Sequence, residues 1–209
     1  KKIIVLEDDL VVNKNFLKFM NSGLEIYKKN KNIASIHGYV YPIKNLKDKI
    51  NGNYFFLKGA DCWGWATWSK SWEKFQSNGK SLLKKIEKKN IIKEFNFNNS
   101  FDYYKMLKDQ TKNKNDSWAV RWYASAFVND MLTLYPVYSY VKNIGIDKSG
   151  INSKLDLLNL GNKKNITKTF NIKKQKVVES KIGREQFEFF FKSKKFYKIK
   201  ILLKNFLNV

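Results

Sequence analysis

The sequence predicts an α/β fold, because short apolar runs rich in β-branched residues alternate with longer segments of helical apolar spacing. The clearest strand–helix unit lies at the start of the sequence. The apolar run at residues 3–6 ends at Glu7, and apolar residues then recur at helical spacing over residues 15–29. A continuous apolar run of this kind is typical of a strand buried on both faces, as in parallel sheets. We therefore expect a sheet flanked by helices.

The same alternation continues along the chain. Further strands or short extended segments are expected at residues 33–37, 54–57, 132–135, 138–141 and 143–146. Residues 69–104 are charged and helical in pattern, with Trp72, Phe75, Leu82, Leu83 and Ile86 as the expected inward positions. Another helix is expected to run to about Asn129, with Asp116 or Ser117 as its N-cap.

The composition changes after Gly150, which predicts two parts: a main domain at residues 1–150 and a Lys/Asn-rich extension at residues 151–209. Residues 151–182 are expected to be loosely structured, and residues 184–209 to be helical. Apolar side chains recur in this last segment at the spacing of an interfacial amphipathic helix, namely Phe196, Ile199, Leu203 and Phe206. The alternative is a helix that folds back on the core.

The charge is strongly positive, because 41 Lys and Arg stand against 18 Asp and Glu, giving +23. Such a surplus favours a nucleic acid or an anionic membrane as partner, unless it only reflects the frequent use of Lys and Asn. Arg121 and Arg184 are the only arginines, whereas base and phosphate recognition favours the guanidinium group. We therefore expect long-range attraction and no specific nucleic acid. The single cysteine, Cys62, excludes an internal disulfide.

Three carboxylates follow the first expected strand directly: Glu7, Asp8 and Asp9. Mg2+ and Mn2+ take oxygen ligands, often one or two carboxylates together with substrate phosphates. The triplet therefore predicts a metal–diphosphate site. The alternative is an acidic helix N-terminus, stabilised by the helix dipole without a ligand.

Tryptophans cluster around a glycine at residues 59–72. Trp63, Gly64 and Trp65 predict a rigid turn with apolar ring faces suited to a sugar, whereas Trp68 and Trp72 are expected in the core. Asp61 lies beside this turn. It is a second candidate for the carboxylate that binds the substrate or acts as the general base. The alternative is a tryptophan-rich core turn.

Asp116 begins a third group of candidate residues. It is either the N-cap of the following helix or a general base that accepts a proton from an acceptor hydroxyl. Arg121 could bind a phosphate or steady a neighbouring carboxylate. The single histidine, His37, and Cys62 are expected to have structural roles.

These patterns together resemble bacterial sugar transferases, similar to the metal-dependent, inverting N-acetylglucosaminyltransferase family of the A-type glycosyltransferase fold. The resemblance covers residues 3–150. It rests on residues 5–10, the tryptophan block at 59–72, Asp116-Ser117-Trp118 with Arg121-Trp122, Leu134-Tyr135-Pro136 and Asn143-Ile144-Gly145. Two departures stand out: Gly150-Ile151-Asn152 replaces a Gly-x-His-like stretch, and the first strands of the family fold, which cradle the nucleotide base, have no counterpart.

The resemblance implies a Rossmann-like fold and a role for each matching position. Asp9 would bind Mn2+ or Mg2+ and join it to the diphosphate of a UDP-sugar donor. Asp8 would lie near the ribose, and Glu7 would touch the donor sugar. Gly64 and Trp65 would lie beside the sugar pocket, and Asp116 would be the catalytic base.

The resulting hypothesis is a hexosyl- or N-acetylhexosaminyl-transferase that acts on a glycan or lipid-linked glycan, such as a lipopolysaccharide or capsule precursor. We expect it to be cytoplasmic, with peripheral attachment of its lysines to the inner face of an anionic membrane. Two alternatives stay open: an inactive fragment or remnant of such an enzyme, and a basic nucleic-acid-binding protein.

Overall fold

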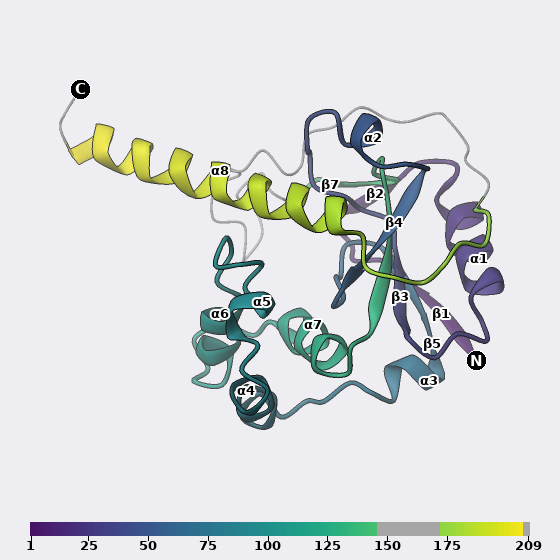
Figure 1. Ribbon diagram of the computed structural model, residues 1–209, viewed down its shortest axis with the longest axis horizontal. Coiled ribbons are helices and arrows are strands. Elements are labelled where there is room, and N and C mark those ends of the chain that lie inside the picture. Colours follow the sequence, from purple (N-terminus) through teal and green to yellow (C-terminus); the bar gives the residue numbers. More distant parts are fainter. Residues whose placement is uncertain (146–171, 207–209) are drawn as a thin grey trace.

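A computed structural model describes residues 1–145 and 172–206, with side chains up to Lys194. Its centre is a five-stranded mixed sheet with helices on both faces, which confirms the α/β prediction (Figure 1). The strand order is β1-β5-β3-β6-β4; β3 and β6 are parallel, and the other neighbours are antiparallel. The strands are β1 (Lys2–Val5), β3 (Ile33–His37), β4 (Tyr54–Lys58), β5 (Trp65–Trp68) and β6 (Leu132–Pro136).

A separate two-stranded antiparallel ribbon joins β2 (Leu10–Val12) to β7 (Val141–Asn143). The ribbon pairs the segment that follows the acidic triplet with the segment that follows β6. Two segments were expected at residues 138–141 and 143–146, whereas the structure has the single strand β7 there, and residues 138–140, 144 and 145 lie outside it. β2 was not predicted, because three residues are too few to show the alternation of a strand.

One face of the sheet is covered by α1 (Phe16–Ile26), which packs against β3 and β5 (Figure 1). Helix and strand approach closely, since a Cβ atom at Gly23 would lie 3.0 Å from three side-chain carbons of Ile36. The other face carries α7 (Trp118–Val128), which in turn contacts α4 and α6. The remaining helices of the body are α2 (Leu46–Lys49), α3 (Ser69–Trp72), α4 (Gly79–Lys88), α5 (Ile92–Phe95) and α6 (Tyr103–Gln110).

The helix expected near the C-terminus is present as α8 (Lys181–Phe206). Its first turns dock on the body, where Phe187, Phe190 and Phe191 are buried, and the rest of the helix extends away from the body (Figure 1). Residues 172–182 were expected to be loosely structured, and residues 172–180 form no helix or strand apart from an isolated bridge between Glu179 and Phe56 of β4, although Ile172 is buried. The apolar residues of this segment are isolated in the sequence and show no periodic pattern, so its contacts could not be predicted. Residues 151–171 and the expected boundary at Gly150 lie outside the described residues.

Two burial predictions were wrong. β1 is an edge strand that pairs only with β5 in the described chain, antiparallel, and Ile3 is 57% exposed. A short apolar run does not distinguish an edge strand from a central one. Trp72 is 38% exposed, since it stacks on Phe75 at the surface with a ring-centroid distance of 4.6 Å. Leu82 and Ile86 are fully buried, as predicted.

Candidate functional site

Three strand ends meet at one edge of the sheet. Val5, the last residue of β1, lies opposite Trp65, the first residue of β5, and His37 at the end of β3 also pairs with Trp65. The residues that follow β1 and β3 therefore lie beside those that precede β5. This edge brings together the acidic triplet, residues 38–41 and residues 60–64.

The acidic triplet forms a tight turn in which the carbonyl of Glu7 accepts a hydrogen bond from the N–H of Leu10 at 3.2 Å. Asp8 is exposed, whereas Glu7 and Asp9 are partly buried. Burial raises the pKa of Glu7 above its ordinary value of 4.5, and the charges of Asp9, Asp61 and Asp8 raise it further. Asp61 thus adds a fourth carboxylate to the field of the triplet.

Asp9 fits the role of a single protein ligand to a divalent cation. Its Oδ1 is buried without a hydrogen-bond partner, and its carbonyl accepts a hydrogen bond from the N–H of Ile144 at 2.9 Å. Within residues 1–145 and 172–194, no three His, Cys, Asp or Glu side chains are grouped as a metal cage. Mg2+ commonly binds through one or two carboxylates, with phosphates and water as its other ligands. The donor set matches that mode of binding.

Gly64 is in the left-handed region, with φ of +68°, where glycine is favoured. Its carbonyl accepts a hydrogen bond from the N–H of Gly38 at 2.7 Å. A Cβ atom at position 64 would lie 2.7 Å from Cγ2 of Val141. The close approach that requires glycine here is therefore to Val141 of β7, and it joins the ribbon to the sheet edge.

The two tryptophans beside Gly64 lie in different surroundings. Trp63 is partly exposed and contacts Tyr39 edge to face, with ring centroids 4.8 Å apart. Trp65 is only 3% exposed and packs against Trp72, Trp118 and Trp122. The structure thus places Trp63 at the opening between the strand ends, and Trp65 in an aromatic cluster beneath α7. Trp68 is buried, as predicted.

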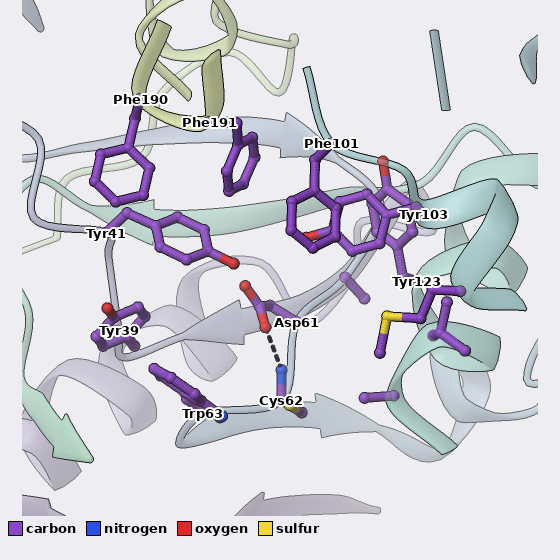
Figure 2. A pocket seen from close by; sticks show the side chains of 14 residues that line it. Tyr39, Tyr41, Asp61, Cys62, Trp63, Phe101, Tyr103, Tyr123, Phe190 and Phe191 are labelled. Carbon is purple, nitrogen blue, oxygen red and sulfur yellow. Dashed lines mark hydrogen bonds between the residues drawn. The ribbon is translucent and has the colours of Figure 1, made fainter. Parts of the chain in front are cut away.

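A cavity of about 210 Å³ lies next to this opening (Figure 2). Its wall combines the segments after β3 and before β5 with residues of α6, α7 and α8. Asp61 is the only charged residue among the lining residues of the described chain. Beside Asp61, the lining includes the aromatic residues Tyr39, Tyr41, Trp63, Phe101, Tyr103, Phe190 and Phe191. Only Asp61 and Trp63 of this set were predicted from the sequence, because no local pattern relates the other residues to this place.

The chain just before Phe101, a residue of the cavity wall, forms a turn with left-handed backbone conformation. Phe97, Asn98 and Asn99 all have positive φ, between 48° and 62°. α8 holds this turn: the Arg184 guanidinium lies 4.7 Å from the centre of the Phe97 ring, and Nδ2 of Asn98 donates to Oε1 of Glu188 at 2.7 Å. The position of Phe101 thus depends on the docking of α8.

Asp61 is held by its own loop, since Oδ1 accepts a hydrogen bond from the N–H of Cys62 at 2.8 Å. Burial, and then the charge of Asp61, raises the pKa of the Cys62 thiol well above its usual value. The thiol stays protonated at neutral pH, as expected of a packing residue. His37 is fully buried, and burial lowers its pKa, so that it is neutral and structural.

Asp116 does not cap α7. Ser117 is the N-cap, and its Oγ accepts a hydrogen bond from the N–H of Val120 at 3.2 Å. Asp116 is exposed, and its carboxylate forms no hydrogen bond or ion pair with the described residues. Arg121 lies away from the cavity lining, with Nη1 donating to the carbonyl of Ser77 at 3.1 Å.

Comparison of the chain with protein-family models, curated proteins and solved structures finds no match. The fold and the site together define a mixed α/β protein with an acidic, aromatic-lined edge of the sheet. The chemistry of that edge follows from its residues alone.

Proposed function

We propose that the chain is a glycosyltransferase of the A-type fold that moves a sugar from a UDP-sugar donor to a glycan acceptor. The observation that carries this proposal is the convergence of Glu7, Asp8, Asp9 and Asp61 beside an aromatic opening at one sheet edge. A buried carboxylate oxygen without a partner on Asp9, in the field of three further carboxylates, favours a bound cation. The partly exposed ring of Trp63 at the opening favours a sugar ring. The transferred group would be a hexosyl or N-acetylhexosaminyl residue.

The donor would bind at the acidic turn. Asp9 would hold Mn2+ or Mg2+ through its unpartnered oxygen, with Glu7 and Asp8 directed to the donor sugar and the ribose. When bound, the metal ion neutralises negative charge on the departing diphosphate. Gly64 keeps the backbone of this opening in place through its contact with Val141.

The acceptor would approach from the side of α7. Asp116 would accept the proton of the acceptor hydroxyl, whose oxygen forms the new bond to the anomeric carbon while the bond to UDP breaks. This role is available because Ser117 already caps the helix. Positioning of the two substrates would supply much of the rate enhancement. Trp65 and Arg121 lie outside the cavity lining, and they would stabilise the structure around this site.

Isothermal titration of UDP with and without Mn2+ tests the donor site. Asp9→Asn should abolish metal-dependent binding, and the matched control Asp48→Asn, at an exposed position of α2, should leave it unchanged. Absence of metal-dependent binding in the folded wild-type chain would overturn the proposal for this chain and favour an inactive remnant. Equal binding by wild type and Asp9→Asn would remove Asp9 from the site.

Lysines gather at the opposite end of β1, around a hollow of about 600 Å³ lined by Lys1, Lys28, Lys29, Lys31, Lys70 and Lys74, among others. Only Lys28 among these six is ion-paired in the described chain. We propose that this surface attracts an anionic membrane that carries a lipid-linked acceptor, as a peripheral contact. No helix in the described ranges is long and apolar enough to span a bilayer. Stronger salt-sensitive binding to single-stranded nucleic acid than to anionic vesicles would favour the nucleic-acid alternative.

A further inference from the structure

The aromatic rings of the cavity form a continuous arc (Figure 2). Successive ring centroids along it are 4.8 Å apart for Trp63–Tyr39, 5.6 Å for Tyr39–Tyr41, 5.1 Å for Tyr41–Phe191, 5.0 Å for Phe191–Phe101 and 4.4 Å for Phe101–Tyr103. Several neighbours are nearly perpendicular, at 84° for Tyr39–Tyr41 and 74° for Tyr41–Phe191. Rings in this arrangement present both faces and edges to the enclosed space.

Among the described residues, Asp61 supplies the only charge on this wall. Figure 2 shows its carboxylate in the space that the rings surround, directed toward the Tyr41 hydroxyl, while one oxygen accepts from the N–H of Cys62. No lysine or arginine is among the lining residues of the described chain. Glu7 and Asp9 add negative charge nearby. The formal charge on the described cavity lining is therefore negative, although the whole chain carries +23.

This combination selects among ligand classes. An anion would meet a carboxylate and negative ring faces. A fully enclosed sugar would need a partner for each of its hydroxyls, whereas the wall offers Asp61, the hydroxyls of a few tyrosines and otherwise mostly apolar side chains. A methylated ammonium group needs no hydrogen bonds, and it gains from both aromatic faces and a carboxylate.

We propose that this cavity binds a small quaternary ammonium group, held by the aromatic arc and by the charge of Asp61. The volume of about 210 Å³ lies below the range of about 300–1,000 Å³ typical of pockets for drug-sized ligands, so a headgroup fits where a nucleotide does not. The inference goes beyond the proposed sugar transfer, because it concerns a cation on the substrate or on a separate effector. It does not depend on the metal or on UDP.

The direct test compares choline with dimethylbutanol, the uncharged alcohol in which carbon replaces the quaternary nitrogen. Titration calorimetry on the full chain, without metal or nucleotide, should show choline binding about tenfold more tightly or better. Equal binding of the two, or no choline binding by the folded chain, would overturn the proposal. Tighter binding of methyl glucoside than of choline would also overturn it, and would assign the cavity to a sugar.

Variants locate the binding site. Asp61→Asn keeps the size of the side chain and should weaken choline binding about tenfold or more, whereas Asp48→Asn removes the same charge elsewhere and should not. Phe191→Leu should weaken it, and Phe189→Leu should not, because Phe189 is 68% exposed on the same helix. Thermal unfolding checks that each variant is folded. Unchanged affinity in Asp61→Asn would overturn the proposal.

The donor-site variant separates this proposal from the previous one. Asp9→Asn should lose metal-dependent UDP binding and weaken choline binding much less than Asp61→Asn does. A chain that binds choline and not UDP would support the ammonium site and overturn the transferase proposal. The reverse result would overturn the ammonium site alone.

Discussion

Gly145 lies so close to Asp9 that a Cβ atom at position 145 would be 2.5 Å from Oδ2 and 3.0 Å from Cγ of the carboxylate. Gly145 follows the β2–β7 ribbon, and the N–H of the preceding Ile144 donates to the Asp9 carbonyl at 2.9 Å. The glycine therefore leaves room for the carboxylate, while its neighbour holds the backbone. A residue far along the chain thus fixes the position of the proposed metal ligand.

Gly145→Ala should displace the Asp9 carboxylate and weaken Mn2+-dependent UDP binding about tenfold, because a shifted ligand loses its coordination geometry. Titration calorimetry measures this affinity. Asp48→Asn, at an exposed position of α2, is the control, and thermal unfolding checks that Gly145→Ala is folded. Equal UDP affinity in both variants would show that the Asp9–Gly145 contact has no role in donor binding.

The two residues before α7 should separate stability from catalysis. Ser117→Ala removes the N-cap hydrogen bond to Val120 and should lower the free energy of unfolding by about 1 kcal/mol. Asp116→Asn should change stability by less than about 0.5 kcal/mol and slow sugar transfer about 100-fold or more. Urea unfolding and a UDP-release assay measure the two effects. A normal transfer rate in Asp116→Asn would exclude it as the general base.

Glu7→Gln should stabilise the fold at neutral pH. Burial, with the charges of Asp9, Asp61 and Asp8, raises the pKa of Glu7 above 4.5. As the pH rises through 4.5, the unfolded chain therefore ionises first, and the folded state loses stability until its own raised pKa is passed. The stability gained by Glu7→Gln should be present at pH 7 and should disappear as the pH falls below 4.5.

Urea unfolding from pH 3 to pH 8 measures this difference. Glu185→Gln serves as the control, because Glu185 is exposed on α8 and has no ion pair with the described residues. A Glu7→Gln variant that is less stable than wild type at pH 7 would contradict the destabilising role of this carboxylate.

Phe187 should be the main anchor of α8. It is 1% exposed and packs against Phe55, Tyr41 and Tyr135, so that Phe187→Ala should lower the free energy of unfolding by about 3–5 kcal/mol. Phe189→Ala, on the exposed side of the helix, should change it by less than about 0.5 kcal/mol. Similar values for the two variants would mean that α8 docks in another orientation.

Much of the fold could be predicted from local patterns. The strand at residues 33–37 matches β3, and the helix expected at residues 15–29 contains α1, because apolar periodicity and turn residues are local properties. β5 was not predicted, since Trp65 was assigned to a glycine turn and Trp68 to a core position at helical spacing. The edge position of β1 was also missed, because strand order depends on pairings between distant segments.

The candidate site was predictable only in part. The acidic triplet, Asp61 and Trp63 stood out because charges and tryptophans cluster there in the sequence, and the structure brings these residues to one edge. The aromatic arc was not predicted, since Tyr41, Phe101 and Phe191 come from three separate regions. The role of Ser117 as N-cap needed the helix boundary, which sequence patterns locate only within a few residues.

The left-handed turn at Phe97–Asn99 has a consequence for how the protein is made. Its backbone is unfavourable for non-glycine residues, and contacts from Arg184 and Glu188 hold it. Translation produces α8, which carries these two residues and the wall residues Phe190 and Phe191, after the rest of the wall, at about 5–20 residues per second. The nascent chain therefore carries its acidic turn before it carries a finished cavity, and ligand binding there becomes possible only after α8 has left the ribosome.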